Sequence, residues 1–354
     1  MGVLLAMVSF IGPAAARDWI IKADGSGDAP TIQAGIDSAL AGDNVVIEAD
    51  TYTGPGNRDI NFGGKAITVT GVTAVSTIVD CSSVTTGFTF NSGEGTGSIL
   101  TRVTIRNAGV TGGDGGGIII QDASPTVTDC IIEGCNAGNG GGIYVWQSTV
   151  ATSPVIQFNH ITGNTAAAWG GGIWVRGAAS PTIDGNTVSG NSAANGAGIA
   201  VTESDAAPTI TGNTVHDNTA SAMGGGFWAF DTRAGALTLS GNVFYGNSAP
   251  VGGGLYFERT NGAAVNTNTV TENSATNLGS EIFMTNTSVT INTTIVAFNT
   301  GAQAGRSSCP GSLSSCWASS LPSRWRPRSS SRCEGRGRAS RFAWPAAGSS
   351  RPAC

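Results

Sequence analysis

The stretch that decides the fold is a glycine-rich hexapeptide that recurs through the middle of the chain. Its copies read GGGIII at 115–120, GGGIYV at 140–145, GGGIWV at 170–175, GAGIAV at 196–201, GGGFWA at 224–229, GGGLYF at 252–257 and, degraded, GSEIFM at 279–284. A second segment follows each copy, as in SPTIDGNTVSGNSA from Ser180. The last asparagine of this segment recurs in steps of 26 to 29 residues. That period suits one coil of a β-solenoid and is short for a helical hairpin repeat.

Apolar residues alternate with polar or small residues inside each coil, which is the pattern of a strand that buries one face. Three apolar columns run through the repeats. They hold Val127, Ile156, Ile183, Ile210, Leu239, Val265 and Ile291; Ile132, Ile161, Val188, Val215, Phe244, Val270 and Val296; and Ile118, Ile143, Ile173, Ile199, Phe227, Leu255 and Ile282. Stacked at about 4.8 Å, three short strands per coil predict an all-β fold of three parallel sheets and about ten coils.

Composition agrees with this fold and excludes others. The 354 residues include 53 glycines, and only 12% are charged, so a coiled coil is excluded. The glycines cluster in triplets, which excludes collagen. We expect the recurring asparagines to form side-chain ladders where strands change direction, and the glycines to allow sharp corners. Cys130 and Cys135 replace two of these asparagines, so they either form a short-loop disulfide or fill the ladder; Cys81 is left over.

An amphipathic segment precedes the repeats. From Thr31 to Gly42 the sequence places Ile32, Ile36 and Leu40 on one helical face, with Thr31 as a plausible N-cap and Gly42 as a stop. We expect a short helix here to plug the open end of the solenoid.

The two ends of the chain differ from its body. Residues 1–16 contain a short apolar run followed by Ala14-Ala15-Ala16, which predicts a signal peptide cleaved after Ala16. Residues 1–305 hold 9 basic and 22 acidic residues, whereas 306–354 hold 9 arginines and one glutamate. The acidic body would repel a phosphate backbone, so no nucleic-acid partner is expected. The tail lacks core-building periodicity and is interpreted as disordered or frame-shifted, with a functional basic anchor as the alternative.

A family resemblance rests on the entry region and the repeats together. KADGSGD at 22–28, the TIQAGIDSA segment, GDNVVI at 42–47 and TYT at 51–53 resemble the entry of pectin-lyase-like right-handed parallel β-helix proteins. The GGGI and GNS/GNT repeats look like those of secreted bacterial β-helix repeat proteins and of chlamydial polymorphic outer-membrane proteins. The resemblance implies right-handed coils, with 17–98 as an N-terminal cap with irregular first coils and 99–305 as regular repeats.

The resemblance does not bring a catalytic site with it. The signatures of pectin methylesterases and polygalacturonases do not occur, and the repeats have no lysine and only scattered arginines for a pectate-lyase-like base. His160 and His216 fall on outward positions two coils apart, which is too far for a dyad or a metal pair. The catalytic residues are therefore unknown and no metal or cofactor is expected, although calcium would be implied if the protein were a lyase.

The most informative functional feature is an aromatic column beside the third apolar column. Period two turns Tyr144, Trp174, Trp228, Tyr256 and Phe283 outward, with Ala200 as an interruption. The next outward positions are Trp146, Arg176, Phe230 and Glu258. If exposed, this stripe would suit stacking against a glycan chain. The alternative is structural, with the rings stacked on one another or lying under the loops at 147–152 and 231–236.

These patterns favour a secreted or bacterial cell-surface protein that is non-catalytic and monomeric and has no membrane span. It would bind a polysaccharide, a cell-surface glycan or another surface. The carbohydrate-binding residues expected from the stripe are Tyr144, Trp146, Trp174, Arg176, Trp228, Phe230 and Tyr256. The alternative function is a polysaccharide lyase or glycoside hydrolase.

Overall fold

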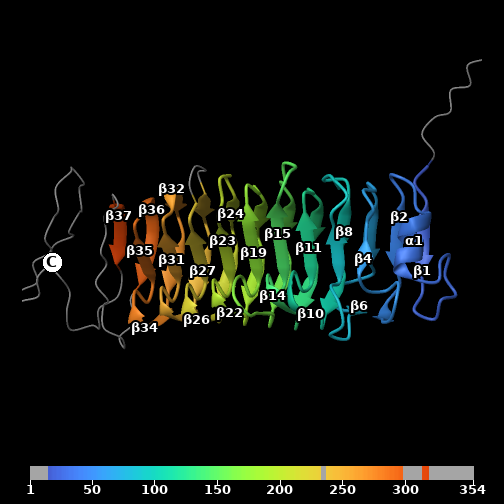
Figure 1. Cartoon of the computed structure of the whole chain (residues 1–354), viewed down its shortest axis with the longest axis horizontal. Coiled ribbons are helices and arrows are strands. Elements are labelled where there is room, and N and C mark those ends of the chain that lie inside the picture. The colour runs from blue at the N-terminus through green and yellow to red at the C-terminus, as the bar shows by residue number, and fades with distance from the viewer. Residues whose placement is uncertain (1–14, 233–236, 298–312, 319–354) are drawn as a thin grey trace, which may run out of the picture.

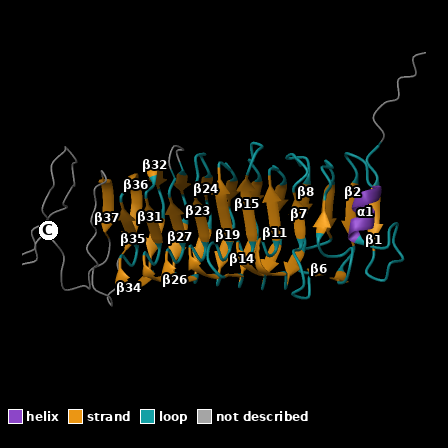
Figure 2. Cartoon of the chain, viewed as in Figure 1, coloured by secondary structure: helices purple, strands orange, loops and turns teal. Residues whose placement is uncertain are grey.

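The computed structural model describes residues 15–232, 237–297 and 313–318, and it forms a rod of stacked parallel coils (Figure 1). Strands make up nearly all of its regular structure, and one short helix lies at the N-terminal end (Figure 2). The strands belong to three parallel sheets, here called A, B and C. The expected all-β solenoid of three sheets and about ten coils is confirmed.

Sheet A contains two strands from most coils. Its first column is β1 (Asp18–Ile21), β2 (Asn44–Ile47), β5 (Thr68–Gly71), β8 (Ile99–Thr101), β12 (Thr126–Thr128), β16 (Val155–Gln157), β20 (Thr182–Asp184), β24 (Thr209–Thr211), β28 (Thr238–Ser240), β32 (Asn261–Asn266) and β36 (Ser288–Ala297). Its second column is β3 (Asp50–Tyr52), β6 (Thr77–Asp80), β9 (Thr104–Arg106), β13 (Ile131–Glu133), β17 (His160–Thr162), β21 (Thr187–Ser189), β25 (Thr214–His216), β29 (Val243–Tyr245) and β33 (Thr269–Thr271), which also pairs with β36.

Sheets B and C complete each coil. Sheet B holds β4 (Ile60–Asn61), β7 (Phe88–Phe90), β11 (Ile118–Gln121), β15 (Ile143–Gln147), β19 (Ile173–Gly177), β23 (Ile199–Thr202), β27 (Phe227–Phe230), β31 (Leu255–Glu258) and β35 (Ile282–Thr285). Sheet C holds β10 (Gly109–Asp114), β14 (Asn136–Asn139), β18 (Thr165–Ala166), β22 (Ser192–Asn195), β26 (Thr219–Met223), β30 (Ser248–Val251) and β34 (Ser274–Leu278).

The three predicted apolar columns line one continuous core. Ile156 pairs with Ile183, Ile161 with Val188 and Ile143 with Ile173, and these six side chains are fully buried. Sheet C is a fourth strand column that the sequence did not predict. Its inward residues are alanines, namely Ala166, Ala193, Ala220 and Ala249, which form a separate small cluster with Ala197. Because alanine side chains are small, this column produces only a weak apolar pattern in the sequence, although it occupies one whole side of the coil.

Two ladders of buried asparagines mark the corners on either side of the second column of sheet A. They are Asn159, Asn186, Asn213, Asn242 and Asn268, and Asn164, Asn191, Asn218, Asn247 and Asn273. In each rung, Nδ2 donates to Oδ1 of the next asparagine, as from Asn213 to Asn242 at 2.9 Å. The expected ladders are thus confirmed. The left-handed backbone falls on the residue before each ladder asparagine, such as Gly212 or Asp217, and not on the asparagine itself.

Of the two alternatives for Cys130 and Cys135, the structure shows that they fill the ladders and are not disulfide-bonded. Cys130 and Cys135 are buried free thiols, and their backbone N–H groups donate to Asn159 Oδ1 and Asn164 Oδ1. Each therefore occupies the first rung of one ladder. Cys81 is also a buried free thiol.

The N-terminal end is closed by helix α1 (Ile32–Ser38). Thr31 is its N-cap, because Thr31 Oγ1 accepts from the backbone N–H of Ala34 at 3.2 Å. Ile32 and Ile36 are buried in the core as expected. The helix stops earlier than predicted, because Ala39 is extended. Leu40 consequently lies beyond it and is 71% exposed, so its predicted place on the buried face is wrong.

Part of the basic tail joins sheet A. Strand β37 (Leu313–Ala318) pairs in parallel with β36, with Ile291 opposite Leu313. These six residues lie within 306–354, and the interpretation of that segment as disordered or frame-shifted stays a prediction. The remainder of that segment and most of the predicted signal peptide lie outside the described residues. Within the described part of the chain, no helix is long and apolar enough to span a membrane.

Candidate functional site

The aromatic column lies on the outer face of sheet B, in the order that the repeats predict. Tyr144 of β15 pairs with Trp174 of β19, which pairs with Ala200 of β23. Trp228 of β27 and Tyr256 of β31 continue the column. These side chains project away from the main core and form a second apolar cluster of their own.

The expectation that this column faces water is wrong. Tyr144 is 4% exposed, Trp174 0%, Trp228 4% and Tyr256 5%. Residues from the corner between sheets C and B pack on the rings, namely Trp169, Met223 and Val251. The stripe is thus a covered second core, as the structural alternative proposed, although part of its cover comes from the stretch before each glycine triplet.

Ring stacking holds the buried column together. The centroids of Tyr144 and Trp174 are 4.6 Å apart with planes 16° from parallel, and those of Tyr256 and Phe283 are 5.3 Å apart at 17°. Offset stacking at such distances is favourable beyond the area that it buries. Burial raises the pKa of Tyr144 to about 12. Burial and then the Glu258 carboxylate raise the pKa of Tyr256 further above its usual range. Both phenols therefore stay neutral and serve as ring surfaces.

A partly exposed rim stands above the buried column, at the next outward position of each strand. Trp146 stacks on Tyr144 at 6.4 Å, and Phe230 stacks on Trp228 at 5.2 Å. Arg176 lies between them in the register and holds Glu203 through Nε at 3.1 Å. Three of the seven predicted site residues, Trp146, Arg176 and Phe230, thus reach solvent in part. We call these three residues and Glu258 the sheet B rim.

The cations at this face are already engaged. The Arg176 guanidinium also lies 5.6 Å from the Trp174 ring centre, and the Arg259 guanidinium lies 4.3 Å from that of Phe230. Glu258 Oε2 accepts from the Tyr256 hydroxyl at 3.0 Å. The rim therefore presents ring faces and hydrogen-bonding groups without an excess of positive charge.

The two histidines lie elsewhere. His160 is exposed on β17, and His216 on β25 stacks on Tyr245 with ring centroids 4.8 Å apart. His216 Nδ1 lies 2.8 Å from Asp217 Oδ2. Their register positions differ by two coils and two residues along the strand, so the structure does not bring them together.

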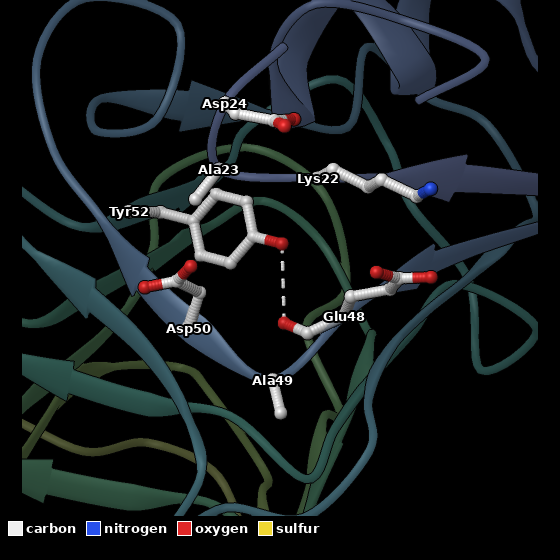
Figure 3. Close-up of a pocket in the computed structure, with 7 residues that line it drawn as sticks. All are labelled: Lys22, Ala23, Asp24, Glu48, Ala49, Asp50 and Tyr52. Carbon is white, nitrogen blue, oxygen red and sulfur yellow. Dashed lines mark hydrogen bonds between the residues drawn. The ribbon is translucent and has the colours of Figure 1, made fainter. Parts of the chain in front are cut away.

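A separate small hollow of about 160 Å³ opens near the N-terminal end (Figure 3). Lys22, Asp24, Glu48, Asp50 and Tyr52 line it. Figure 3 shows the three carboxylates spread around the Tyr52 ring, without converging on one point. The Tyr52 hydroxyl lies 2.9 Å from Ile21 O and 3.1 Å from Glu48 O. Within the described residues, no group of three or more His, Cys, Asp or Glu side chains is arranged to hold a metal ion.

Three features of sheet B were missed from the sequence. Trp169 covers the break at Ala200, because its ring lies 5.4 Å from Trp174 and 6.3 Å from Trp228. The Trp228 indole Nε1 and Asn195 Oδ1 are buried without a hydrogen-bond partner. Trp169 directly precedes a glycine triplet, a position where the other copies carry Asp, Asn, Met, Val or Leu. That contrast was a usable signal, whereas unpaired atoms have no sequence signature.

Several solved structures are similar to the chain at low identity. The catalytic domain of a GH87 α-1,3-glucanase is 15% identical with a TM-score of 0.39, over 81% of this chain and 46% of that one. Rice weevil pectin methyl esterase is 11% identical with a TM-score of 0.36, over 76% and 89%. A mannuronic acid specific polysaccharide family 6 lyase from human gut microbiota is 14% identical with a TM-score of 0.32, over 79% and 82%. This chain thus spans less than half of the glucanase chain, and these values carry no inference about activity.

A family comparison is more decisive. No curated protein matches the sequence significantly. The family model described as a right handed beta helix region matches residues 92–275, which is more than half of the chain. The resemblance to pectin-lyase-like parallel β-helix proteins is therefore confirmed at the level of the fold. The matched range lies within the stacked coils that carry sheets A, B and C, and the chain belongs to the right-handed β-helix family.

Proposed function

We propose that this protein is a secreted or cell-surface β-helix that binds a polysaccharide through the sheet B rim, without itself catalysing a reaction. The observation that carries the proposal is the combination of partly exposed Trp146 and Phe230 with the Arg176–Glu203 pair on one regular face. Aromatic faces and oriented polar groups are what sugar rings pack against and hydrogen-bond to.

The buried stripe supports this proposal by holding the rim residues in place, whereas an exposed stripe would contact the ligand along its whole length. Tyr144 and Trp228 hold the rim rings by stacking, so Trp146 and Phe230 are fixed before a ligand arrives. A preordered contact surface loses less side-chain entropy on binding. The three coil steps between the two rings place them about 14 Å apart along the rod, from the usual strand spacing. A glycan lying along the solenoid axis would contact both.

The test is binding to a panel of soluble and insoluble polysaccharides by affinity electrophoresis and sedimentation. The double variant Trp146→Ala/Phe230→Ala is expected to lose binding, since each truncation removes a stacking surface of about 1 kcal/mol or more. Phe158→Ala is the matched control, because Phe158 is 55% exposed in the turn between β16 and β17, away from sheet B, and should leave binding unchanged.

Three outcomes bear on the proposal. Retained binding in the double variant, with a folded circular dichroism spectrum, would place the ligand elsewhere. A wild-type protein that binds no member of the panel would overturn the carbohydrate-binding function. Release of reducing ends or unsaturated products would favour the lyase or hydrolase alternative over non-catalytic binding.

A further inference from the structure

The aromatic column breaks at Ala200, and this break carries a distinct arrangement of polar groups. Ala200 pairs with Trp174 on one side and Trp228 on the other. The ring of Trp169 reaches over the gap from the cover and lies near both indoles. Three indole rings and one small residue thus meet at a single point on the face that also carries the rim.

The two indoles on either side of Ala200 differ in one respect. Trp174 Nε1 donates to Thr202 Oγ1 of the next coil at 2.9 Å. Trp228 Nε1 has no partner, although the side chain is only 4% exposed. The residue that corresponds to Thr202 is Glu258, whose Oε2 already accepts from the Tyr256 hydroxyl. Buried polar groups are nearly always paired, so an unpaired indole donor in an otherwise well-bonded column calls for a partner.

An unpaired acceptor lies at the same break. Asn195 Oδ1 is buried without a partner. Asn195 directly precedes Gly196, where an added Cβ would stand 2.7 Å from the Cβ of Ala200 and 3.0 Å from that of Trp228. The residues that carry the donor and the acceptor therefore lie in adjacent coils, on either side of Ala200. A hydroxyl group both donates and accepts, so a single hydroxyl matches the pair.

The charges around the break favour an uncharged ligand. Arg176 is paired with Glu203, and Arg259 lies on the Phe230 ring. Glu258 adds a carboxylate one coil further on, next to Phe230 in the register. The two arginines, Arg176 and Arg259, are balanced by Glu203 and Glu258, so a uronic acid carboxylate placed here would find no net positive charge to offset the cost of its desolvation.

We propose that Trp228 and Asn195 form a hydroxyl-binding subsite that selects uncharged sugars for the sheet B rim. The inference rests on the proposed function and specifies its ligand class. Trp228 Nε1 donates to a sugar hydroxyl, and Asn195 Oδ1 accepts from it. Phe230 borders the subsite in its stacked position on the Trp228 indole, while Trp146 holds the glycan further along the rod.

The test compares two indoles in the same column. Wild type, Trp228→Phe and Trp174→Phe are titrated with neutral glucan and xylan oligosaccharides and with oligogalacturonate and oligomannuronate, each at low and high salt. Trp228→Phe should weaken neutral-sugar binding about tenfold, which is 1.4 kcal/mol. Trp174→Phe removes the same ring area, but the donor it removes is already bonded to Thr202 Oγ1. This variant should therefore lower the melting temperature more than Trp228→Phe does, and it should change binding by no more than about twofold.

The outcomes separate this inference from the proposed function. Equal binding by wild type and Trp228→Phe, with loss in Trp146→Ala/Phe230→Ala, would overturn the subsite and leave carbohydrate binding intact. A preference for the uronates, lost at high salt, would overturn the selection of uncharged sugars. Trp228→Phe melting as far below wild type as Trp174→Phe would show that the Trp228 donor is paired within the protein, which also contradicts the subsite.

Discussion

Cys130 and Cys135 show how a single position can be filled by different chemistry in successive coils. Each thiol lies near a backbone carbonyl of the preceding coil, and the asparagine in the same position of the next coil donates to the equivalent carbonyl. Cys135 Sγ is 3.8 Å from Ile105 O, and Asn164 Nδ2 is 2.9 Å from Ile132 O. Burial raises the pKa of both thiols to about 12. They are therefore protonated donors and unreactive at neutral pH. The same slot accepts any small side chain that can donate inward.

The burial of Trp174 makes a prediction about stability. Trp174→Ala should lower the free energy of unfolding by about 3–5 kcal/mol, in the range expected for a large buried aromatic residue. Ile173→Ala, which empties the main core from the same strand, should lower it by about 2–5 kcal/mol. Urea denaturation followed by circular dichroism measures both. A loss below about 1 kcal/mol for Trp174→Ala, beside a normal loss for Ile173→Ala, would show that the outer face is open after all.

At the scale of the element, Glu281 ends one asparagine ladder. It stands in the repeat where earlier coils have a glycine such as Gly254, and a Cβ at Gly254 would be only 2.9 Å from Asn273 Nδ2. Glu281 Oε2 accepts from Asn273 Nδ2 at 2.7 Å, in place of a further asparagine. The side chain is 2% exposed and its Oε1 has no partner. Burial raises the pKa of Glu281 to about 7, against a weaker lowering by Asn273, with the nearby Glu272 adding to the rise.

This placement predicts a pH dependence of stability. Folded Glu281 keeps a proton that the unfolded chain releases near pH 4.5. Its contribution is therefore fully present below about pH 4.5 and is lost as the pH rises to about 7, with a slope of at most about 1.4 kcal/mol per pH unit. Glu281→Gln keeps the acceptor for Asn273 and should flatten this part of the profile. Asp205→Asn, an exposed carboxylate, is the control. An unchanged slope in Glu281→Gln, measured by urea denaturation from pH 4.5 to 8, would contradict the assignment.

The elements also show why part of the molecule was predictable. Columns of Ile, Val and Leu at period two predict strands because one face is buried in every coil, and sheets A and B follow from them. Sheet C was not predicted because its inward residue is alanine. Alanines such as Ala166 and Ala193 differ too little in size and hydrophobicity from their small neighbours to give a period-two pattern. The sequence correctly predicts that the aromatic residues lie on the outer face of sheet B, but the prediction that they are exposed to solvent is wrong. Period two tells which face a ring is on, whereas the cover by Trp169 and Met223 depends on how a glycine corner folds back.

At the scale of the whole molecule, the strands of each coil pair with those of the adjacent coils, and Trp169 is a side chain that reaches one coil further, to Trp228. Such a rod has stability that is approximately a sum of coil and interface terms. The N-terminal end has a cover, since α1 buries Ile32 and Ile36 against the first coils. Lys65 fastens the helix end, because its Nζ donates to the carbonyls of Ile36, Asp37 and Ala39 at 2.7–2.9 Å. Removing this cover should therefore act locally.

Hydrogen exchange can test that locality. Ile36→Asp places a charge in the buried face of α1 and should release the helix, so the amides of β1, β2 and β5 should exchange faster by at least tenfold. Those of β23, in the middle of the rod, should change by less than about twofold, because the coils between them keep their own contacts. Ser38→Ala lies on the exposed side of the same helix and serves as the control. Equal acceleration in β2 and β23 would mean that the rod opens as one cooperative unit, in which case the cap stabilises every coil that carries the sheet B rim.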